Sequence, residues 1–218
     1  MELKNVRLYR MVHVGNVPHV LKHGITHKHS HNANPNFINI GDISLIDTRS
    51  KKRIIVDNGD DFKFGAQTII LGNFIPFYFG VRMPMLYVMQ NGGNFVQRAT
   101  PPKDIIYLVC SVDHFIQAEH TYYFSDGHAT DHYTTFYDMT KVGDLPKLVD
   151  WDAVKTAYWG GQENLDIKRK KQAEFLVSGD IPPEYIVGFG CYNETAKANL
   201  QAMGIKDGKI KVIPNAYF

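Results

Sequence analysis

The sequence predicts a single α+β domain, in which strands and helices pack around one core. The chain has 218 residues, a length that suits one domain with a sizeable core. Hydrophobic residues make up 44% and charged residues 21%, which is ordinary globular usage and argues against a disordered chain. Short apolar runs alternate with capped helical segments, without a repeat, a linker or a low-complexity tract.

The N-terminal part of the chain predicts a strand followed by a short helix. Residues 7–14 are predicted to form a short strand. In the helix that follows, we expect Asn16 to be the N-cap, Pro18 to lie in the first turn and Gly24 to end it in a left-handed conformation.

The next part is a polar, weakly periodic stretch. We interpret residues 25–65 as a long surface segment with one short helix at 43–49, and such ordered loops are usually functional. An aromatic strand is expected at 74–80, followed by a helix at 83–90 with Pro84 near its first turn.

The remainder of the chain supplies most of the expected sheet. Helices are predicted at 150–159, with an Asp cap, and at 193–203, ended by Gly204. The predicted strands are 104–112, 122–124, 173–177, 185–190 and 209–213.

Charge and cysteine content restrict the function and the compartment. There are 24 basic and 22 acidic residues, so the formal charge of +2 argues against a binder driven by overall positive charge. Cys110 and Cys191 lie in apolar runs and are expected to be buried free thiols, as in a reducing cytosol. The N-terminal segment has no apolar run long enough for a signal peptide or a membrane span, so we expect a cytoplasmic protein.

A histidine-rich stretch raises the alternative of a metal hydrolase. Two of its histidines are four residues apart on the predicted helix, the spacing that zinc ligands use. No HExxH pattern or converging carboxylate accompanies them, so we interpret the stretch as a solvated loop and expect no metal. The histidines are His19, His23, His27, His29 and His31.

A glutamate next to a run of cations is the most informative local feature. Lys168, Arg169, Lys170 and Lys171 immediately precede the strand that Glu174 opens. Such cations usually lie on a solvated face, but they can also hold a carboxylate ionised while it faces a cleft. We therefore expect Glu174 to be solvent-facing and to contribute little to stability. Neither GxGxxG nor GxxxxGK[ST] occurs.

Several separated motifs together resemble DarT-type DNA ADP-ribosyltransferase toxins. The resemblance covers essentially the whole chain in the expected order, and a wider similarity to poly(ADP-ribose) polymerases is visible in the first strand–helix and in the aromatic segment. There the chain departs from the wider family, because Arg10 occupies the position of a nicotinamide-side histidine. The motifs are residues 8–24, 39–41 with Arg49 downstream, 77–79, 82–87, 126–128, 135–137, 150–151, 158–159 and 169–177.

The resemblance implies a fold and an activity. The fold is a single ADP-ribosyltransferase domain over residues 1–218, similar to poly(ADP-ribose) polymerases, with a split central antiparallel sheet and peripheral helices. The implied toxin transfers ADP-ribose from NAD, as substrate, to thymine or guanine in single-stranded DNA and releases nicotinamide. A macrodomain antitoxin is the implied partner, and we expect a monomer that binds no membrane. The alternatives are a transferase of the same fold acting on protein or RNA and a catalytically silent NAD-binding module.

The resemblance also implies roles for individual residues. Glu174 stabilises the oxocarbenium character of the ribose and positions or deprotonates the incoming base. Arg49, or Arg53 nearby, contacts the pyrophosphate or arranges the active site, since arginine suits phosphate. Residues implied to bind NAD are Arg10, His13, Asn16, Arg49, Tyr78 and Tyr87, while Lys168, Arg169, Lys170 and His128 face the DNA.

Overall fold

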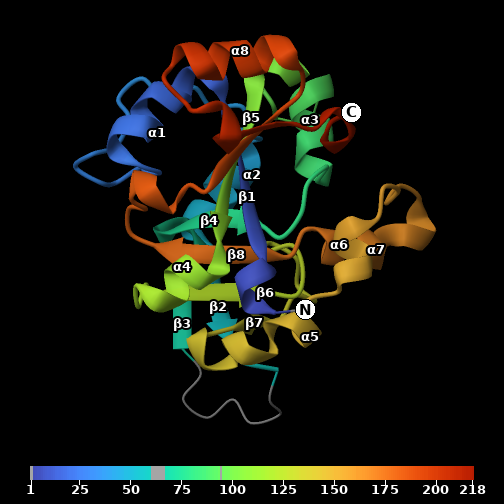
Figure 1. The fold of residues 1–218 in the computed structure, drawn as a ribbon. Helices are drawn as coiled ribbons and strands as arrows, with labels where there is room; N and C mark the ends of the chain where they lie inside the picture. The colour runs from blue at the N-terminus through green and yellow to red at the C-terminus, as the bar shows by residue number, and fades with distance from the viewer. Residues whose placement is uncertain (1, 60–66, 94) are drawn as a thin grey trace.

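The computed structural model describes residues 2–59, 67–93 and 95–218, in which a large central sheet is surrounded by helices (Figure 1). Its eight described strands have the order β10-β9-β5-β1-β4-β8-β6-β7, and all pairs are antiparallel except β10 with β9. A separate two-stranded ribbon joins β2 to β3. The fold is therefore α+β, as the sequence predicts.

The elements have the following bounds. The strands are β1 Arg7–His13, β2 Arg53–Val56, β3 Gln67–Ile70, β4 Phe74–Tyr78, β5 Ile105–Ser111, β6 Tyr122–Ser125, β7 Phe136–Tyr137, β8 Glu174–Ser178, β9 Gly188–Cys191 and β10 Ile210–Val212. The helices are α1 Val17–His23, α2 Ile43–Lys51, α3 Pro84–Asn91, α4 Val112–Gln117, α5 Leu145–Leu148, α6 Trp151–Lys155, α7 Leu165–Lys171 and α8 Glu194–Ala202.

The sheet is divided between β1 and β4. Strand β1 pairs with β5 along seven residues but meets β4 at one pair, Tyr9 with Tyr78. Strand β4 then pairs with β8 along five residues, and its last pair sets Tyr78 opposite Glu174. Arg10 spans the division, because its Nη1 donates a hydrogen bond to the carbonyl oxygen of Pro76 at 2.9 Å. The polar groups of the site therefore gather where the two halves of the sheet meet.

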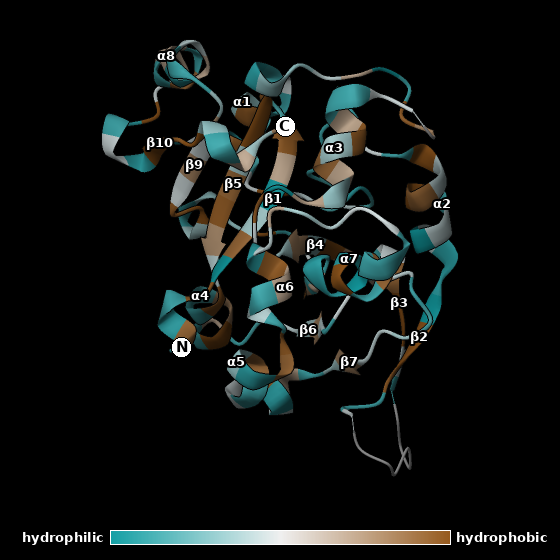
Figure 2. Ribbon diagram, turned by 90° about the vertical axis from the view of Figure 1, so that its right-hand side faces the viewer, coloured by the Kyte–Doolittle hydropathy of each residue, from teal (hydrophilic) through white to brown (hydrophobic). Residues whose placement is uncertain are grey.

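The core is built from the central strands. Six of the seven residues of β5 are buried, and the hydropathy colouring shows the central strands as mainly hydrophobic, with more hydrophilic helices outside (Figure 2). Phe175 on β8 stacks on Tyr122 with ring centroids 4.9 Å apart and packs against Phe115 of α4. Burying one such side chain contributes about 1.5–3 kcal/mol, which fixes β8 and hence Glu174 at its start.

The structure confirms the expected strands near the middle of the sheet and corrects several other expectations. The helix expected at 150–159 ends at Lys155, and the strand expected from 185 begins at Gly188. The segment 25–65 contains β2 after its helix, and residues 60–65 lie outside the described residues. Elements that the sequence analysis missed are β2, β3, β7, α4, α5 and α7.

Asn16 does not cap α1 with its side chain, contrary to the expectation. It is 1% exposed, and its side-chain amide instead forms two hydrogen bonds with the backbone of Ile38. Gly24 does end the helix, with φ of 79°, and a Cβ there would clash with the carbonyl oxygen of Ile181. Among the described residues, no helix has both the length and the apolar character needed to cross a membrane.

Candidate active site

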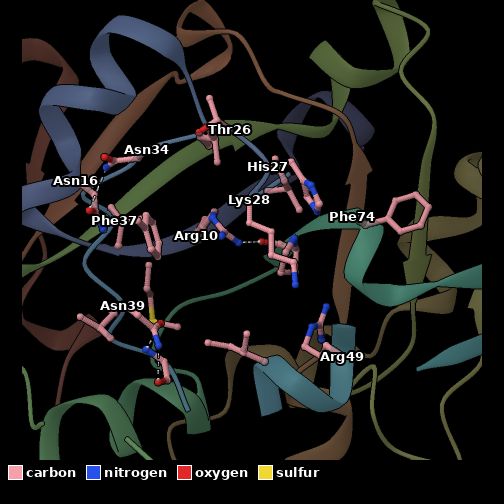
Figure 3. Close-up of a pocket in the computed structure, with 18 of the residues that line it drawn as sticks. Arg10, Asn16, Thr26, His27, Lys28, Asn34, Phe37, Asn39, Arg49 and Phe74 are labelled. Carbon is pink, nitrogen blue, oxygen red and sulfur yellow. Dashed lines mark hydrogen bonds between the residues drawn. The ribbon is translucent and has the colours of Figure 1, made fainter. Parts of the chain in front are cut away.

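A cavity of about 390 Å³ opens beside the division of the sheet. This volume lies within the range of small-molecule sites. Its walls come from β1, β4, the start of β8 and the segment from α1 to α2, which Figure 3 shows in close-up. It brings together six of the residues to which the family resemblance assigned a role: Arg10, Asn16, Arg49, Tyr78, His128 and Glu174.

The centre of the charged site is an ion pair between Glu174 and Arg49. Arg49 Nη1 donates to Glu174 Oε1 at 3.0 Å, and Nη2 lies 2.8 Å from Oε2. The Glu174 side chain is 1% exposed and that of Arg49 17%. Burial by itself lowers the pKa of Arg49, but the carboxylate outweighs it and the net shift is upward. The expectation of a solvent-facing Glu174 is therefore wrong, and the cation that holds it comes from α2.

The turn after β6 positions the carboxylate. Ser125 Oγ accepts the backbone N–H of Glu174 at 3.1 Å and donates to the carbonyl of Gly127 at 2.7 Å. The N–H of Ala129 donates to Glu174 Oε1 at 3.3 Å. Within the described chain, Glu174 Oε2 accepts no hydrogen bond and has Arg49 as its ion-pair partner. This oxygen therefore keeps unused hydrogen-bonding capacity, and a ligand hydroxyl reaches it when the Arg49 side chain, which lies 2.8 Å away, shifts.

Cations outnumber carboxylates on the cavity wall. Figure 3 shows Arg10 and Lys28 near the middle of the cavity and Arg49 entering from α2. Burial and the neighbouring Arg49 lower the pKa of Arg10 to about 10, so it stays charged at neutral pH. The cavity wall has two carboxylates, Glu174 and Asp42, and the Asp42 side chain accepts hydrogen bonds from N–H groups in the first turn of α2. The remaining positive charge suits a ligand that carries phosphate groups.

Asn16 shapes the opposite wall of the cavity. Its Nδ2 donates to the carbonyl of Ile38 at 2.8 Å, and its Oδ1 accepts the N–H of Ile38 at 2.9 Å. Asn34 and Phe37 on this loop also line the cavity, as Figure 3 shows. The sequence analysis missed Asn34, Phe37 and Ile38. Their signal is the segment 32–36, in which three asparagines alternate with an alanine and a proline, a composition that favours turns.

Tyr78 and His128 lie on the same side of the cavity as Glu174. Burial, followed by the charge of Glu174, raises the pKa of Tyr78, so its hydroxyl remains protonated. Burial lowers the pKa of His128, and the nearby Glu174 only partly offsets this, so the ring is neutral at neutral pH. Its Nδ1 lies 2.9 Å from Thr130 Oγ1, and the two share a hydrogen bond.

Three of the residues predicted for the NAD site or its alternative arginine lie outside this cavity. His13 Nδ1 accepts the N–H of Gly15 at 3.0 Å, and the ring lines a neighbouring cavity of about 290 Å³. Tyr87 is 47% exposed on the outer side of α3. Arg53 is exposed on β2, so the geometry selects Arg49 as the arginine at the carboxylate.

The cation run before Glu174 is only partly available to a ligand. Arg169 and Lys170 share the carboxylate of Asp166, at 3.0 Å and 2.8 Å. Lys168 is exposed, and its Nζ lies 5.4 Å from the ring centroid of Trp159.

Lys171 corrects the expectation of four surface cations. It is 1% exposed, and its Nζ donates to the carbonyl oxygens of Val154 at 2.9 Å and Thr156 at 2.8 Å. Burial lowers its pKa to about 8. The side chain therefore ties α7 to the end of α6 instead of facing DNA.

The histidine-rich stretch forms stacked and hydrogen-bonded rings. His19 and His23 stack with centroids 4.7 Å apart, and His27 Nε2 lies 2.8 Å from the carbonyl oxygen of Gly72. The part of the chain that the structure describes contains no group of three or more potential ligand side chains that could hold a metal ion.

Comparisons with known proteins place this geometry in a family. A family model described as ssDNA thymidine ADP-ribosyltransferase, DarT, matches residues 9–218. A DNA ADP-ribosyl transferase of Thermus sp. (strain 2.9) is 27% identical over 187 residues, covering 86% of this chain and 81% of that protein. One from Thermus aquaticus is 33% identical over 133 residues, covering 61% of this chain and only 55% of that relative.

Solved structures show the same fold. Thermus sp. 2.9 DarT in complex with ADP-ribosylated ssDNA has a TM-score of 0.79 and 21% identity, covering 98% of this chain and 96% of that one. The same DarT in complex with NAD⁺ has a TM-score of 0.74 and 21% identity, and the match covers 100% of this chain and 99% of that one. Thermosipho africanus DarTG in complex with ADP-ribose has a TM-score of 0.75 and 24% identity; this chain covers 51% of its length, and 98% of this chain is matched. Because the family model matches nearly the whole chain, the protein belongs to the DarT family of ssDNA thymidine ADP-ribosyltransferases.

Proposed function

We propose that this protein transfers ADP-ribose from NAD to a thymine base of single-stranded DNA and releases nicotinamide. The observation that carries the proposal is the buried Glu174–Arg49 pair at the edge of a cavity lined by additional cations. The family match supports this substrate and favours thymine over the guanine alternative.

The chemistry requires a carboxylate at this position. The bond between nicotinamide and ribose C1′ breaks, its electron pair leaves with nicotinamide, and positive charge develops on the ribose. Glu174 stabilises that charge, and Oε2, which accepts no hydrogen bond within the described chain, is the oxygen that would accept a ribose hydroxyl once Arg49 shifts. A thymine ring nitrogen then bonds to C1′ and loses its proton, for which Glu174 is the candidate acceptor.

The cavity wall has the groups needed to orient NAD. Arg10 and Lys28 carry the positive charge for the pyrophosphate. Tyr78 supplies an aromatic face and a protonated hydroxyl beside Glu174 for the nicotinamide side. A base inside a duplex cannot reach such a cavity, which favours a single strand.

We also propose the setting of the reaction. Residues 1–218 form one ADP-ribosyltransferase domain, acting as a monomeric toxin in the cytoplasm, where NAD and DNA occur together. Its two buried free cysteines suit a reducing compartment. A macrodomain antitoxin that removes the mark is the proposed partner. A Thermosipho africanus protein described as a DNA ADP-ribosyl transferase–DNA ADP-ribosyl glycohydrolase fusion supports it, with 27% identity over 212 residues. This chain matches 48% of that fusion.

The test is transfer from labelled NAD by the purified protein. We expect label in single-stranded oligonucleotides that contain thymine, and none in duplexes or in strands without thymine. A Glu174→Gln variant should transfer label on the order of 10²–10³-fold more slowly. Label in strands whose only reactive base is guanine would favour the guanine alternative. Label in RNA or in protein from a lysate, without label in DNA, would favour those substrates. NAD binding without any transfer would indicate a silent binding module.

A further inference from the structure

Three aromatic rings from distant parts of the chain cluster outside the NAD cavity. Tyr87 lies on α3, Trp159 in the connection between α6 and α7, and Phe218 beside α3. The ring centroid of Tyr87 is 5.3 Å from that of Phe218 and 6.1 Å from that of Trp159, both nearly perpendicular. In both ribbon views, α3 and residue 218 lie together, with α6 and α7 below them (Figures 1 and 2). Tyr87 remains 47% exposed in this cluster.

Two cations accompany the rings. Arg82 Cζ lies 4.6 Å from the centroid of the Phe218 ring, and Lys168 Nζ lies 5.4 Å from that of Trp159. Within the described chain neither cation is in an ion pair, and Arg82 Nε is buried without a hydrogen-bond partner. These two cations and three rings are called the aromatic platform below. Among the described residues no carboxylate lies within ion-pair distance of either cation, so they suit an anionic ligand with flat groups.

Arg82 also has a strained backbone. Its φ is 58°, which costs a residue with a side chain on the order of 1–3 kcal/mol, and its N–H donates to the hydroxyl of Tyr107 at 3.1 Å. That hydroxyl in turn donates to the carbonyl of Ala216 at 3.0 Å. The buried Tyr107 thus fixes the strained backbone at Arg82, and this keeps the Arg82 guanidinium at the Phe218 ring.

The platform adjoins the active site across one helix. Met85 and Met89 of α3 line the NAD cavity, while Tyr87 lies on the other side of the same helix. The separation is on the order of a helix diameter, ~10 Å. From Lys168 the chain continues through the last turn of α7 directly to Glu174. A single strand with its reacting base in the cavity therefore has the platform within reach of a neighbouring nucleotide.

We propose that the aromatic platform binds a nucleotide that flanks the modified thymine. The flanking base stacks on the exposed Tyr87 ring, whose orientation Trp159 and Phe218 fix, and Lys168 and Arg82 attract the adjoining phosphates. This inference rests on the proposed function. Stacking requires an unpaired base, so the platform favours single strands over duplexes. Because each base has a flat face, the platform adds affinity without demanding one sequence.

The experiment compares two single-stranded substrates: an oligonucleotide with flanks on both sides of one thymine, and the shortest fragment that is still modified. For Tyr87→Ala we expect the KM for the flanked substrate to rise about five- to hundredfold, the loss of one aromatic–base stack. The kcat at saturating DNA, the KM for NAD and the KM for the short fragment stay at wild-type values. Tyr87→Phe keeps the ring and should restore the KM.

Two lysine variants, one at the platform and one elsewhere on the surface, test the contribution of charge. Lys168→Ala should reduce the salt dependence of binding to the flanked oligonucleotide by about one phosphate contact, measured by fluorescence anisotropy without NAD. Lys206→Ala removes the same charge from an exposed site after α8 and should leave the slope unchanged. An unchanged KM for the flanked substrate in Tyr87→Ala, or an equal rise for the short fragment, would overturn the platform. If the wild type modifies no DNA at all, the proposed function fails instead, and anisotropy still reports whether the platform binds the strand.

Discussion

Replacing Glu174 by glutamine separates the charge of this side chain from its shape. The amide retains an oxygen that can accept the N–H of Ala129 and a guanidinium N–H of Arg49, but it has no negative charge. Removing one well-placed electrostatic stabiliser of a transition state slows an enzyme on the order of 10²–10³-fold. We expect that loss in kcat for Glu174→Gln, with the affinity for NAD little changed, because the charge on the ribose develops only in the transition state.

The cost to folding follows from the burial of the pair. Breaking a buried ion pair costs roughly 3–5 kcal/mol, because it leaves one charge buried without a partner. In Glu174→Ala the remaining partner is Arg49, which is 17% exposed and can be partly hydrated, so we expect about 3 kcal/mol. Glu174→Gln keeps hydrogen-bond acceptors and should lose only about 1–2 kcal/mol. Arg49→Ala leaves the 1% exposed carboxylate unpaired and should cost at least as much as Glu174→Ala.

The assay combines product formation per folded enzyme with urea unfolding. Rates are measured by mass spectrometry of an oligonucleotide with one thymine, after circular dichroism has shown each variant to be folded. The double variant Arg49→Ala/Glu174→Ala should be more stable than the sum of the single losses indicates, by about 0.5–3 kcal/mol. A rate for Glu174→Gln within tenfold of wild type would refute the electrostatic role of Glu174. Additive stability losses would refute the coupling of the pair.

Three further predictions concern other parts of the site. Lys171→Met should lower the free energy of unfolding, measured by urea titration, by about 1–3 kcal/mol, because two carbonyl oxygens lose their donor. The control Lys168→Met, at an exposed position nearby, should change the free energy of unfolding by less than about 0.5 kcal/mol. Burial lowers the pKa of His128, so its contribution to stability is complete above about pH 6.5 and is lost as pH falls through the lowered pKa. The free energy of unfolding should therefore fall with pH by up to ~1.4 kcal/mol per pH unit. His128→Asn, unfolded from about pH 4 to 8, should lack this slope, and an unchanged slope would assign it to other groups. Arg53→Ala should keep near-wild-type transfer in the oligonucleotide assay, because this side chain is exposed, whereas Arg49→Ala should not; equal losses would contradict the choice between the two arginines.

Much of the secondary structure is local and could be read from the sequence. The apolar run of β5 is long enough to specify a buried strand, and the Asn193 side chain caps α8 by accepting the N–H of Ala196, as its residue type favours. The short strands β2 and β7 lack such a signal, since β2 has four residues of alternating burial and β7 has two residues, and strands this short are stable only when a partner strand is present. The family motifs also identified Glu174 and Arg49 as candidates before the fold was known.

The partners of the charged residues were decided by the tertiary structure. Sequence proximity suggested that the cations before Glu174 hold its charge, but Lys171 points inward from α7 and Arg169 pairs with the carboxylates of Asp126 and Asp166. The cation at Glu174 comes instead from Arg49, 125 residues earlier, because β4 and β8 pair beneath the end of α2. Burial of a charge depends on the sum of all packing neighbours, which no local pattern records. The chain by itself thus determined which residue types are present for catalysis, and only folding determined which of them meet in a site with little access to water.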